Sequence, residues 1–358
     1  MVYRARVELL YLLGFSLDLV NMFIGTVAYP AIAAELHASV SQLAWIGNAY
    51  MLGLTLVIPL GHWLAARVGE RRVLCLSLAL FTVGALLAGT APSIAWLIAW
   101  RLLQGLGGGL LIPVGQAAAY RECPPADRAR LTTRIMAVAL LVPALSPTLG
   151  GLLVEWGSWR GVLLISVPLA VVALVLAACW LHPSVPASAP ALDRRGLLLG
   201  GVGLSLLLVA LSLLAEPAQR MSGAALLVGA ALVLSGYARS ARRTTHPVLH
   251  WSLLRHAGLR VAMLVYLLVP GTFIGVQLVA TLLLHRMGYS PAAIGGFMLP
   301  WAIASACAIA TARHGLTRIG ARPLLSAGMG CQAVGIALLT GVQSGHPVLP
   351  VVAFALMG

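Results

Sequence analysis

One carboxyl group of this chain lies where acids are rare. Of the nine acidic residues, only Asp18 falls deep inside a long apolar stretch, residues 8–30. A stretch of that length can cross a bilayer as a helix, and a carboxyl group in mid-membrane usually marks an ion or substrate path because it is costly to place. Asn21 follows three residues later and would share its helix face. Proton transfer at Asp18 is the chemistry that this pattern indicates.

The second charged candidate is Arg101, inside the apolar segment 94–116. It lies roughly 10 Å from the outer end of that segment, and Asp18 lies roughly 15 Å from the inner end of its own. In a hydrocarbon core roughly 30 Å thick, the long side chain of Arg101 could therefore reach Asp18. A guanidinium favours the ionised carboxylate and burial favours the protonated acid, so alternating exposure would load and release a proton. The alternative, a structural clamp on backbone carbonyl groups, stays open for Arg101.

The composition indicates what surrounds these residues. Hydrophobic residues make up 60% of the 358 residues and charged residues 9%, against about 25% charged residues in soluble proteins. Mean hydropathy is +0.97. Apolar runs of about twenty residues alternate with short arginine-bearing loops, which is typical of a polytopic helical membrane protein. The net charge of +14 does not indicate nucleic-acid binding, because the arginines form no long polar tract. The five cysteines are scattered singly, so no metal site is expected.

Twelve apolar segments are predicted to be helices, and the last is too short to span a bilayer. They are residues 8–30, 43–62, 73–91, 94–116, 135–154, 161–181, 196–215, 222–238, 260–284, 292–312, 323–342 and 347–358. If the N-terminus is cytoplasmic, nineteen of the 23 arginines fall on the inner side, which favours this orientation. The chain stops without a polar tail, so we expect its last set of helices to be cut short.

Two stretches divide the segments. Residues 183–195 are rich in Pro, Ala and Ser and are predicted to be a flexible linker. Residues 239–260 are basic and are interpreted as a positive loop on the inner face, with lipid binding as the alternative. We therefore expect an N-terminal six-helix bundle, a linker with two extra helices, and a partial C-terminal bundle, with bounds at 1–182, 183–243 and 244–358.

A proline- and glycine-rich segment is the first of the motifs that shape helices. Pro143 and Pro147 are four residues apart, and Gly150 and Gly151 follow. Prolines bend a helix and free backbone carbonyl groups, while glycines let a neighbouring helix come close. Such a helix could act as a rocking contact between two bundles, or it could be a locally kinked packing helix.

Glycines shape two further regions. Gly105 and Gly109 are four residues apart in segment 94–116, which allows close approach of another helix. The loop 62–72 contains Arg67, Gly69 and Arg71, and a similar Gly/Arg-rich loop recurs at 313–322. Both loops fall between the second and third helix of a set, which is the weak internal symmetry of transporters built from repeats.

With these motifs the chain resembles the major facilitator superfamily, in its drug:proton antiporter branch with fourteen transmembrane helices. The matching features are the loop 62–72 and the motifs Arg101-x-x-Gln104-Gly105-x-Gly107-Gly108, Pro147-x-x-Gly150-Gly151 and Glu155-x-x-Ser158-Trp159-Arg160. The resemblance implies an all-α fold of two six-helix bundles with two extra central helices. It also implies alternating access and export of amphipathic drugs against proton entry, without a cofactor, across the bacterial inner membrane. The implied partners are the substrate, protons and the bilayer; a monomer is expected, and an accessory periplasmic adaptor protein stays open.

The chain departs from the family pattern at three places. The first-helix aspartate of the family would fall at Asn21, so Asp18, one turn nearer the cytoplasm, would take over the titrating role. Ala66 stands where the pattern often has Asp, and His62 where it has Gly, which weakens a charge-based cytoplasmic latch. Ser146 replaces a glycine of the fifth-helix motif.

The expected substrate cavity is apolar and aromatic. No Asp or Glu occurs from Pro217 to Gly358, so Asp18 is the candidate for recognising a cation. The candidate lining residues, each of which could instead serve packing or the aromatic belt, are Asn48, Gln104, Gln116, Gln277 and Trp301. Apolar cavities with few fixed polar groups tolerate varied shapes, which suits several substrates.

Two other functions agree with parts of the sequence. One is transport of a single metabolite, which fixed polar groups in the second half would favour. The other is a transport-dead relative with a sensor or assembly role, favoured by the loop that lacks its aspartate and by the abrupt end. An enzyme is not expected, because the sequence contains no nucleophile–base–acid set, no HExxH and no phosphate-cradling loop.

Overall fold

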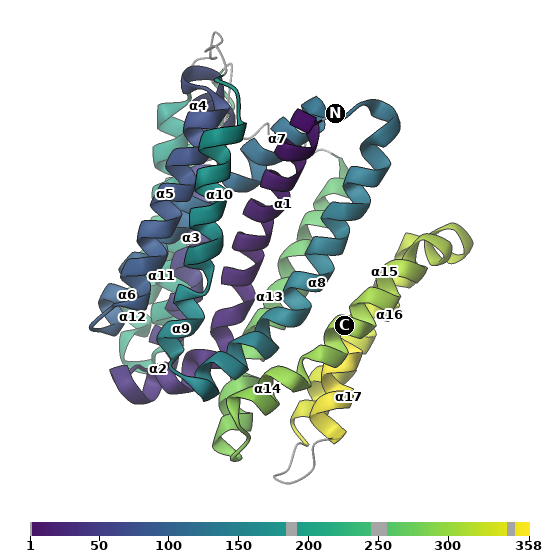
Figure 1. Cartoon of the computed structure of the whole chain (residues 1–358). Coiled ribbons are helices and arrows are strands. Elements are labelled where there is room, and N and C mark those ends of the chain that lie inside the picture. The colour runs from purple at the N-terminus through teal and green to yellow at the C-terminus, as the bar shows by residue number, and fades with distance from the viewer. Residues whose placement is uncertain (1, 184–191, 245–255, 342–347) are drawn as a thin grey trace. The chain divides into compact units, whose positions relative to one another are not determined.

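The computed structural model describes residues 2–183, 192–244, 256–341 and 348–358. Within these ranges every regular element is a helix, and Figure 1 draws them all as coiled ribbons. Eleven helical stretches of the described chain are long and apolar enough to cross a membrane, and the shorter α17 (Val348–Met357) follows them. The all-α polytopic prediction is therefore confirmed. Residues 184–191 of the expected linker 183–195 and residues 245–255 of the basic loop 239–260 lie outside the described residues.

The chain divides into two compact units, and α1 (Val2–Phe23) contributes to both of them. Unit 1 consists of Met1–Gly14, Ser39–Pro124 and Val167–Leu264, and unit 2 consists of Phe15–Ala38, Pro125–Ser166 and Val265–Gly358.

Unit 1 contains the following further elements, with α10 entering it at Val167: α3 (Val40–Val57), η2 (Ile58–Leu60), α4 (Gly61–Val68), α5 (Glu70–Gly89), α6 (Ile94–Gly108), α7 (Leu111–Glu122), α10 (Ser166–Trp180), α11 (Arg194–Ala215), η4 (Pro217–Gln219) and α12 (Arg220–Ala241). Ser39 begins α3 with a capping box, in which its side chain accepts from the Gln42 backbone while the Gln42 side chain accepts from the Ser39 backbone. Helix α6 packs against both α3 and α5, and α11 and α12 form a hairpin.

Unit 2 is built around α8 and the last helices of the chain. Its elements are η1 (Ile24–Ala28), α2 (Tyr29–Leu36), η3 (Pro125–Asp127), α8 (Arg128–Trp156), α9 (Trp159–Leu164), most of α13 (Ala257–Arg286), α14 (Pro291–Phe297), α15 (Leu299–Ile319), α16 (Ala321–Leu339) and α17. Its core is an apolar cluster that includes Val27, Phe273, Leu284, Ile294 and Phe354.

Several predicted apolar segments are not single helices: segments 8–30, 43–62, 161–181 and 292–312 are each divided between two or more helical elements. Two further differences show why the ends shift. Segment 94–116 is not one helix, because α6 ends at Gly108 and α7 begins at Leu111. Pro113 has no N–H to offer the carbonyl group of Gly109, and glycines favour the break. Helix α8 begins at Arg128, several residues before segment 135–154, because exposed polar residues extend the helix beyond its apolar part.

The stretches 62–72 and 313–322, predicted to be loops, are helical except at one glycine each, since α4 and α5 meet at Gly69 and α15 and α16 meet at Gly320. The two glycines share a backbone conformation. Gly69 precedes α5 with φ of 90°, and Gly320 precedes α16 with φ of 84°. Residues other than glycine rarely adopt such values, which explains a glycine at both positions. The similar backbone at the two glycines agrees with the internal symmetry that the sequence indicates.

Candidate functional site

Asp18 and Asn21 are buried side chains of α1 in unit 2. Asp18 is 4% exposed and Asn21 is 3% exposed. The Asn21 side-chain amide donates a hydrogen bond to the Leu17 carbonyl oxygen at 3.0 Å, one turn earlier in the same helix. That bond satisfies one donor of the amide where water is scarce. A carboxyl group and an amide therefore lie buried within one turn of α1, and only the carboxyl group can take up a proton.

Arg101 lies in unit 1 and is 3% exposed. Its Nε donates to the carbonyl oxygen of Ile46 at 3.3 Å, and an Nη atom donates to Oε1 of Gln104 at 2.8 Å. The guanidinium carbon also lies 4.4 Å from the centre of the Tyr50 ring, as a cation–π contact. The hydrogen bond to the Ile46 carbonyl oxygen is the contact expected if Arg101 serves as a structural clamp on backbone carbonyl groups. Arg101 and Asp18 belong to different units, so their pairing remains a prediction.

Gly105 and Gly109 lie where α3 comes close to α6. A Cβ atom on Gly105 would collide with the backbone carbonyl oxygen of Tyr50, and one on Gly109 would lie 2.7 Å from the Leu54 oxygen. Gly107 faces the backbone of Phe81 on α5 in the same way. These glycines bring the helices together around Arg101, so its hydrogen bond to the backbone of α3 depends on them.

The five candidate lining residues fall in both units and differ in exposure. Gln104 is fully buried at 0%, where it accepts the hydrogen bond from Arg101, whereas Asn48 and Gln116 are exposed. In unit 2, the Gln277 side chain is buried and donates to Oγ1 of Thr26 and to the sulfur of Met298, at 3.3 Å each.

Trp301, the fifth candidate, is half-buried in unit 2. Its ring stacks on Phe273 with centres 4.8 Å apart and on Phe23 with centres 6.2 Å apart. These rings come from α1, α13 and α15. The structure therefore gathers aromatic side chains of unit 2 around Trp301, close to the apolar cluster.

The proline- and glycine-rich helix α8 meets α14 within unit 2. A Cβ atom on Gly151 would collide with the Pro291 carbonyl oxygen, and one on Gly295 would collide with the Pro147 oxygen. Thr148 adds a hydrogen bond from its hydroxyl group to the Gly295 oxygen at 3.1 Å.

Two more residues of the motif are also buried in unit 2, away from the contact with α14. Gly150 faces the backbone of η1, where a Cβ atom would lie 2.7 Å from the Ile24 oxygen. Pro143 is buried inside α8. The motif thus forms a dense junction that leaves no room for larger side chains.

In the stretch 62–72, Arg67 lies on α4 and Arg71 on α5, and the two side chains have different partners. The Arg67 guanidinium lies 5.2 Å from the Trp63 ring centre. Arg71 donates to the Ala178 carbonyl oxygen near the end of α10 at 2.5 Å. Because residue 66 is Ala, α4 has no acidic residue at this position. The acidic residue of this region is Glu70, in the first turn of α5.

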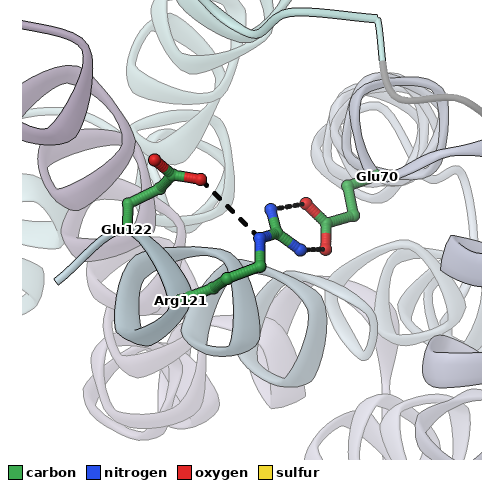
Figure 2. Close-up of polar contacts among 3 residues, drawn as sticks. All are labelled: Glu70, Arg121 and Glu122. Atoms are coloured by element: carbon green, nitrogen blue, oxygen red, sulfur yellow. Dashed lines mark hydrogen bonds and ion pairs between the residues drawn. The ribbon is translucent and has the colours of Figure 1, made fainter.

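The sequence reasoning missed an ion pair between α5 and α7. Arg121 donates to both carboxylate oxygens of Glu70, at 2.5 and 2.6 Å, and its Nε lies 3.6 Å from Glu122 (Figure 2). The Glu70 side chain is only 18% exposed. The available signal was an acid directly after the loop glycine, in a chain with few acids.

A second missed contact ties α2 to α9. Glu35 accepts from the Trp159 indole N–H at 2.6 Å and from Arg160 at 2.5 Å. The Arg160 guanidinium also lies 4.3 Å from the Trp159 ring centre. Trp159 and Arg160 were recognised only as family motif residues, because their partner lies 124 and 125 positions away.

No group of three or more metal-ligating side chains occurs among the described residues. Cys75, Cys123, Cys179, Cys307 and Cys331 are free thiols.

Comparisons with known proteins agree with this architecture. The family described as the Major Facilitator Superfamily matches residues 10–358. A "Multidrug resistance protein B homolog" of Mycobacterium tuberculosis (strain ATCC 25618 / H37Rv) is 33% identical over 352 residues, which cover 95% of this chain and 64% of that protein. "Multidrug resistance protein Stp" of the same strain is 29% identical over 363 residues, covering 99% and 67%. The chain thus spans about two thirds of the length of these relatives.

Solved structures share the fold. The crystal structure of the peptide transporter POT in complex with sulfate gives a TM-score of 0.65 at 16% identity, covering 98% of this chain and 78% of that one. The xylose transporter XylE from E. coli gives 0.59 at 15% identity, covering 99% and 84%. The family match over residues 10–358, together with the shared fold, establishes that this chain belongs to the Major Facilitator Superfamily.

Proposed function

We propose that this protein exports amphipathic drugs or other toxic compounds in exchange for protons, by alternating access, as a member of the fourteen-helix drug:proton branch. The observation that carries the proposal is the burial of Asp18, at 4% exposure, inside a membrane-spanning helix. A carboxyl group there is costly to bury, and such groups usually mark an ion or substrate path. The multidrug resistance names of the similar proteins support drugs as the substrate class.

We propose that Asp18 binds the proton and that Asn21 and Arg101 assist in proton coupling. Burial disfavours the charged carboxylate, so Asp18 takes up a proton when its surroundings are apolar. Water or a guanidinium stabilises the carboxylate and releases the proton. Counted along their apolar segments, Arg101 is level with Asn21 and about one turn above Asp18, a difference that its long side chain can span, and this supports the role.

The substrate is proposed to be held mainly by apolar and aromatic surface. The described lining candidates of unit 2 are Gln277 and Trp301, and those of unit 1 are Asn48, Gln104 and Gln116. Residues 217–358 contain no acid, so a cationic substrate would rely on Asp18 for charge recognition.

The conformational motifs are proposed to control access to the cavity. The junction of α8 with α14 would separate and close again in each cycle, with Gly151 and Gly295 setting how closely the helices approach. The glycine-lined contact of α6 with α3 would stay closed, and the loop residues Arg67, Gly69 and Arg71 would hold the other end of unit 1.

We also propose how the chain is divided into bundles and how it is oriented in the membrane. The N-terminal bundle is placed at 1–182, the two extra helices with their linker at 183–243, and part of the C-terminal bundle at 244–358. The N-terminus is placed in the cytoplasm and the protein in the bacterial inner membrane, because most arginines fall on one side. The protein is proposed to work as a monomer, with an accessory periplasmic adaptor as an additional partner.

Transport in everted membrane vesicles tests this function. A pH gradient should drive accumulation of a fluorescent lipophilic cation, and Asp18→Asn should reduce the gradient-driven rate by about tenfold or more because it removes the titrating group. Asp18→Glu should keep part of the rate. Glu155→Gln, which changes an exposed acid of α8, is the matched control and should behave as the parent protein.

Two outcomes would contradict the proposal at different levels. Unchanged gradient-driven transport in Asp18→Asn, at equal amounts in the membrane, would show that another group couples the proton. A parent protein that moves the dye equally with and without a gradient would contradict proton coupling itself.

A further inference from the structure

A cavity of about 330 Å³ opens in unit 1 at the turn between α4 and α5. It is lined by Val68, Gly69, Arg71, Arg72, Cys75, Ala178 and Pro183, so the first turns of α5 and the end of α10 enclose it. Two lining residues are arginines and none is an acid. Gly69 and Arg71 of this lining also have the conformational role proposed above, but no role was given to Arg72 or to the cavity itself.

The two guanidinium groups differ in how they are held. Arg71 is half-buried and is fixed by its bond to the Ala178 oxygen, which uses one of its five N–H donors. Arg72 is exposed, and among the described contacts it has neither a hydrogen bond nor an ion pair. The cavity thus combines one positioned guanidinium with one that is available to a ligand.

The nearest acid in sequence does not neutralise this pair of arginines. Glu70 precedes Arg71, but both of its carboxylate oxygens accept hydrogen bonds from Arg121 on α7 (Figure 2). Two adjacent cations without a carboxylate among the lining residues favour an anion, and guanidinium groups suit the oxygens of a phosphate.

The remaining lining residues indicate the source of the phosphate. Val68, Cys75, Ala178 and Pro183 are apolar, so the anion would sit against an apolar wall. The cavity lies at the first turn of the membrane-spanning helix α5, where phospholipid headgroups are found. Basic pockets between transmembrane helices at a membrane surface are known to suit anionic lipid headgroups.

We propose that Arg71 and Arg72 bind the phosphate of an anionic phospholipid, such as phosphatidylglycerol, in this cavity. Arg72 supplies the main ligand contact, and Arg71 links the headgroup to the end of α10. The proposal does not depend on drug export, because it concerns binding alone.

Cys75 provides a reporter inside the cavity. In a variant that keeps only this cysteine, the other four being replaced by alanine, the rate of maleimide labelling is measured in nanodiscs. Phosphatidylcholine discs give the reference rate, discs with added phosphatidylglycerol test the lipid, and phosphatidylcholine discs with inorganic phosphate test a free ion. Phosphatidylglycerol should slow labelling about fivefold, and phosphate alone should not.

Arginine variants distinguish phosphatidylglycerol binding in this cavity from a nonspecific attraction of the lipid to positive surface charge. Arg72→Gln should abolish the protection by phosphatidylglycerol, and Arg72→Lys should keep part of it because the positive charge remains. Arg239→Gln, which removes one exposed positive charge at the end of α12, should keep the protection. Equal loss in Arg72→Gln and Arg239→Gln would overturn the site in favour of a diffuse attraction.

The same nanodiscs distinguish a lipid phosphate from free inorganic phosphate as the ligand. Equal protection by inorganic phosphate would overturn the lipid as ligand, and no protection in either arm would overturn the site. Native mass spectrometry of the parent protein gives an independent measurement without cysteine substitutions. It should show phosphatidylglycerol retained by the parent protein and by Arg239→Gln but lost from Arg72→Gln, and equal retention in all three would overturn the proposal.

Discussion

Arg121 holds both carboxylate oxygens of Glu70, at 2.5 and 2.6 Å, and so joins the last turn of α7 to the first turn of α5. The pair lies directly after the loop glycine Gly69, in the region where the sequence lacks the acid at Ala66. A two-bond geometry fixes orientation as well as distance. The end of unit 1 therefore has a charge-based connection, supplied by a residue one turn further along the chain than the sequence pattern indicates.

Neutralising this pair should show its energetic coupling. Because Arg121 is more than half exposed, Glu70→Gln and Arg121→Gln in a double-mutant cycle should give a coupling free energy of only about 0.5–1 kcal/mol. The measurement is thermal unfolding in detergent at low and high salt, and the coupling should shrink as salt increases. Glu122→Gln serves as the comparison, because Glu122 lies 3.6 Å from Arg121 without the two-bond geometry. A coupling as large for Glu122 as for Glu70 would contradict the geometry.

Arg101 should not be replaceable by lysine. Lysine keeps the charge but cannot bond Ile46 and Gln104 from one planar group, nor lie flat over the Tyr50 ring. Arg101→Lys should lose about 1–2 kcal/mol of stability, in the range of interhelical hydrogen bonds in membranes. Arg220→Lys, at the exposed start of α12, should lose almost nothing.

Transport separates the two roles of Arg101. If Arg101 also couples protons, Arg101→Lys should change the pH dependence of dye transport per folded molecule. A variant with reduced stability and an unchanged pH profile would leave Arg101 with the structural role alone.

Gly295 and Gly296 are neighbours in α14, but only Gly295 should be sensitive to replacement by alanine. A Cβ atom on Gly295 would collide with the Pro147 oxygen, whereas one on Gly296 would meet nothing within 4 Å. Gly295→Ala should therefore weaken the packing of α8 against α14 by about 1–3 kcal/mol and reduce dye export severalfold. Gly296→Ala should keep export within about twofold of the parent protein. Dye efflux normalised to the amount of protein in the membrane is the measurement, and equal effects of the two variants would contradict the junction.

Glu35 should stabilise the contact of α2 with α9 mainly through Trp159. Glu35→Ala leaves the buried indole N–H without its carboxylate partner, so the melting temperature should fall by roughly 2–4 °C. Glu35→Gln should be milder, because its amide oxygen can still accept from the indole. Glu155→Ala removes an exposed acid and should leave the melting temperature unchanged. A Glu35→Ala protein as stable as the parent would show that this contact contributes nothing measurable.

Much of the architecture was predictable from the sequence because it depends on local composition. Apolar runs of membrane-spanning length predict helices, since each segment must satisfy its own backbone in lipid. A charged residue inside such a run is visible without coordinates, which is why Asp18 and Arg101 stood out. The sequence missed the helix break after Gly108, because glycine and proline can either bend a helix or end it.

The sequence by itself determined the all-helical membrane fold, the superfamily and the rare buried charges. Only the tertiary structure decided which residues meet across helices. Glu70 and Arg121 are 51 positions apart, and Glu35 and Trp159 are 124 apart. It also decided which glycine touches a neighbouring backbone, as the contrast of Gly295 with Gly296 shows. The physical reason is that hydropathy acts along each segment, whereas these contacts depend on which face of a helix packs against another.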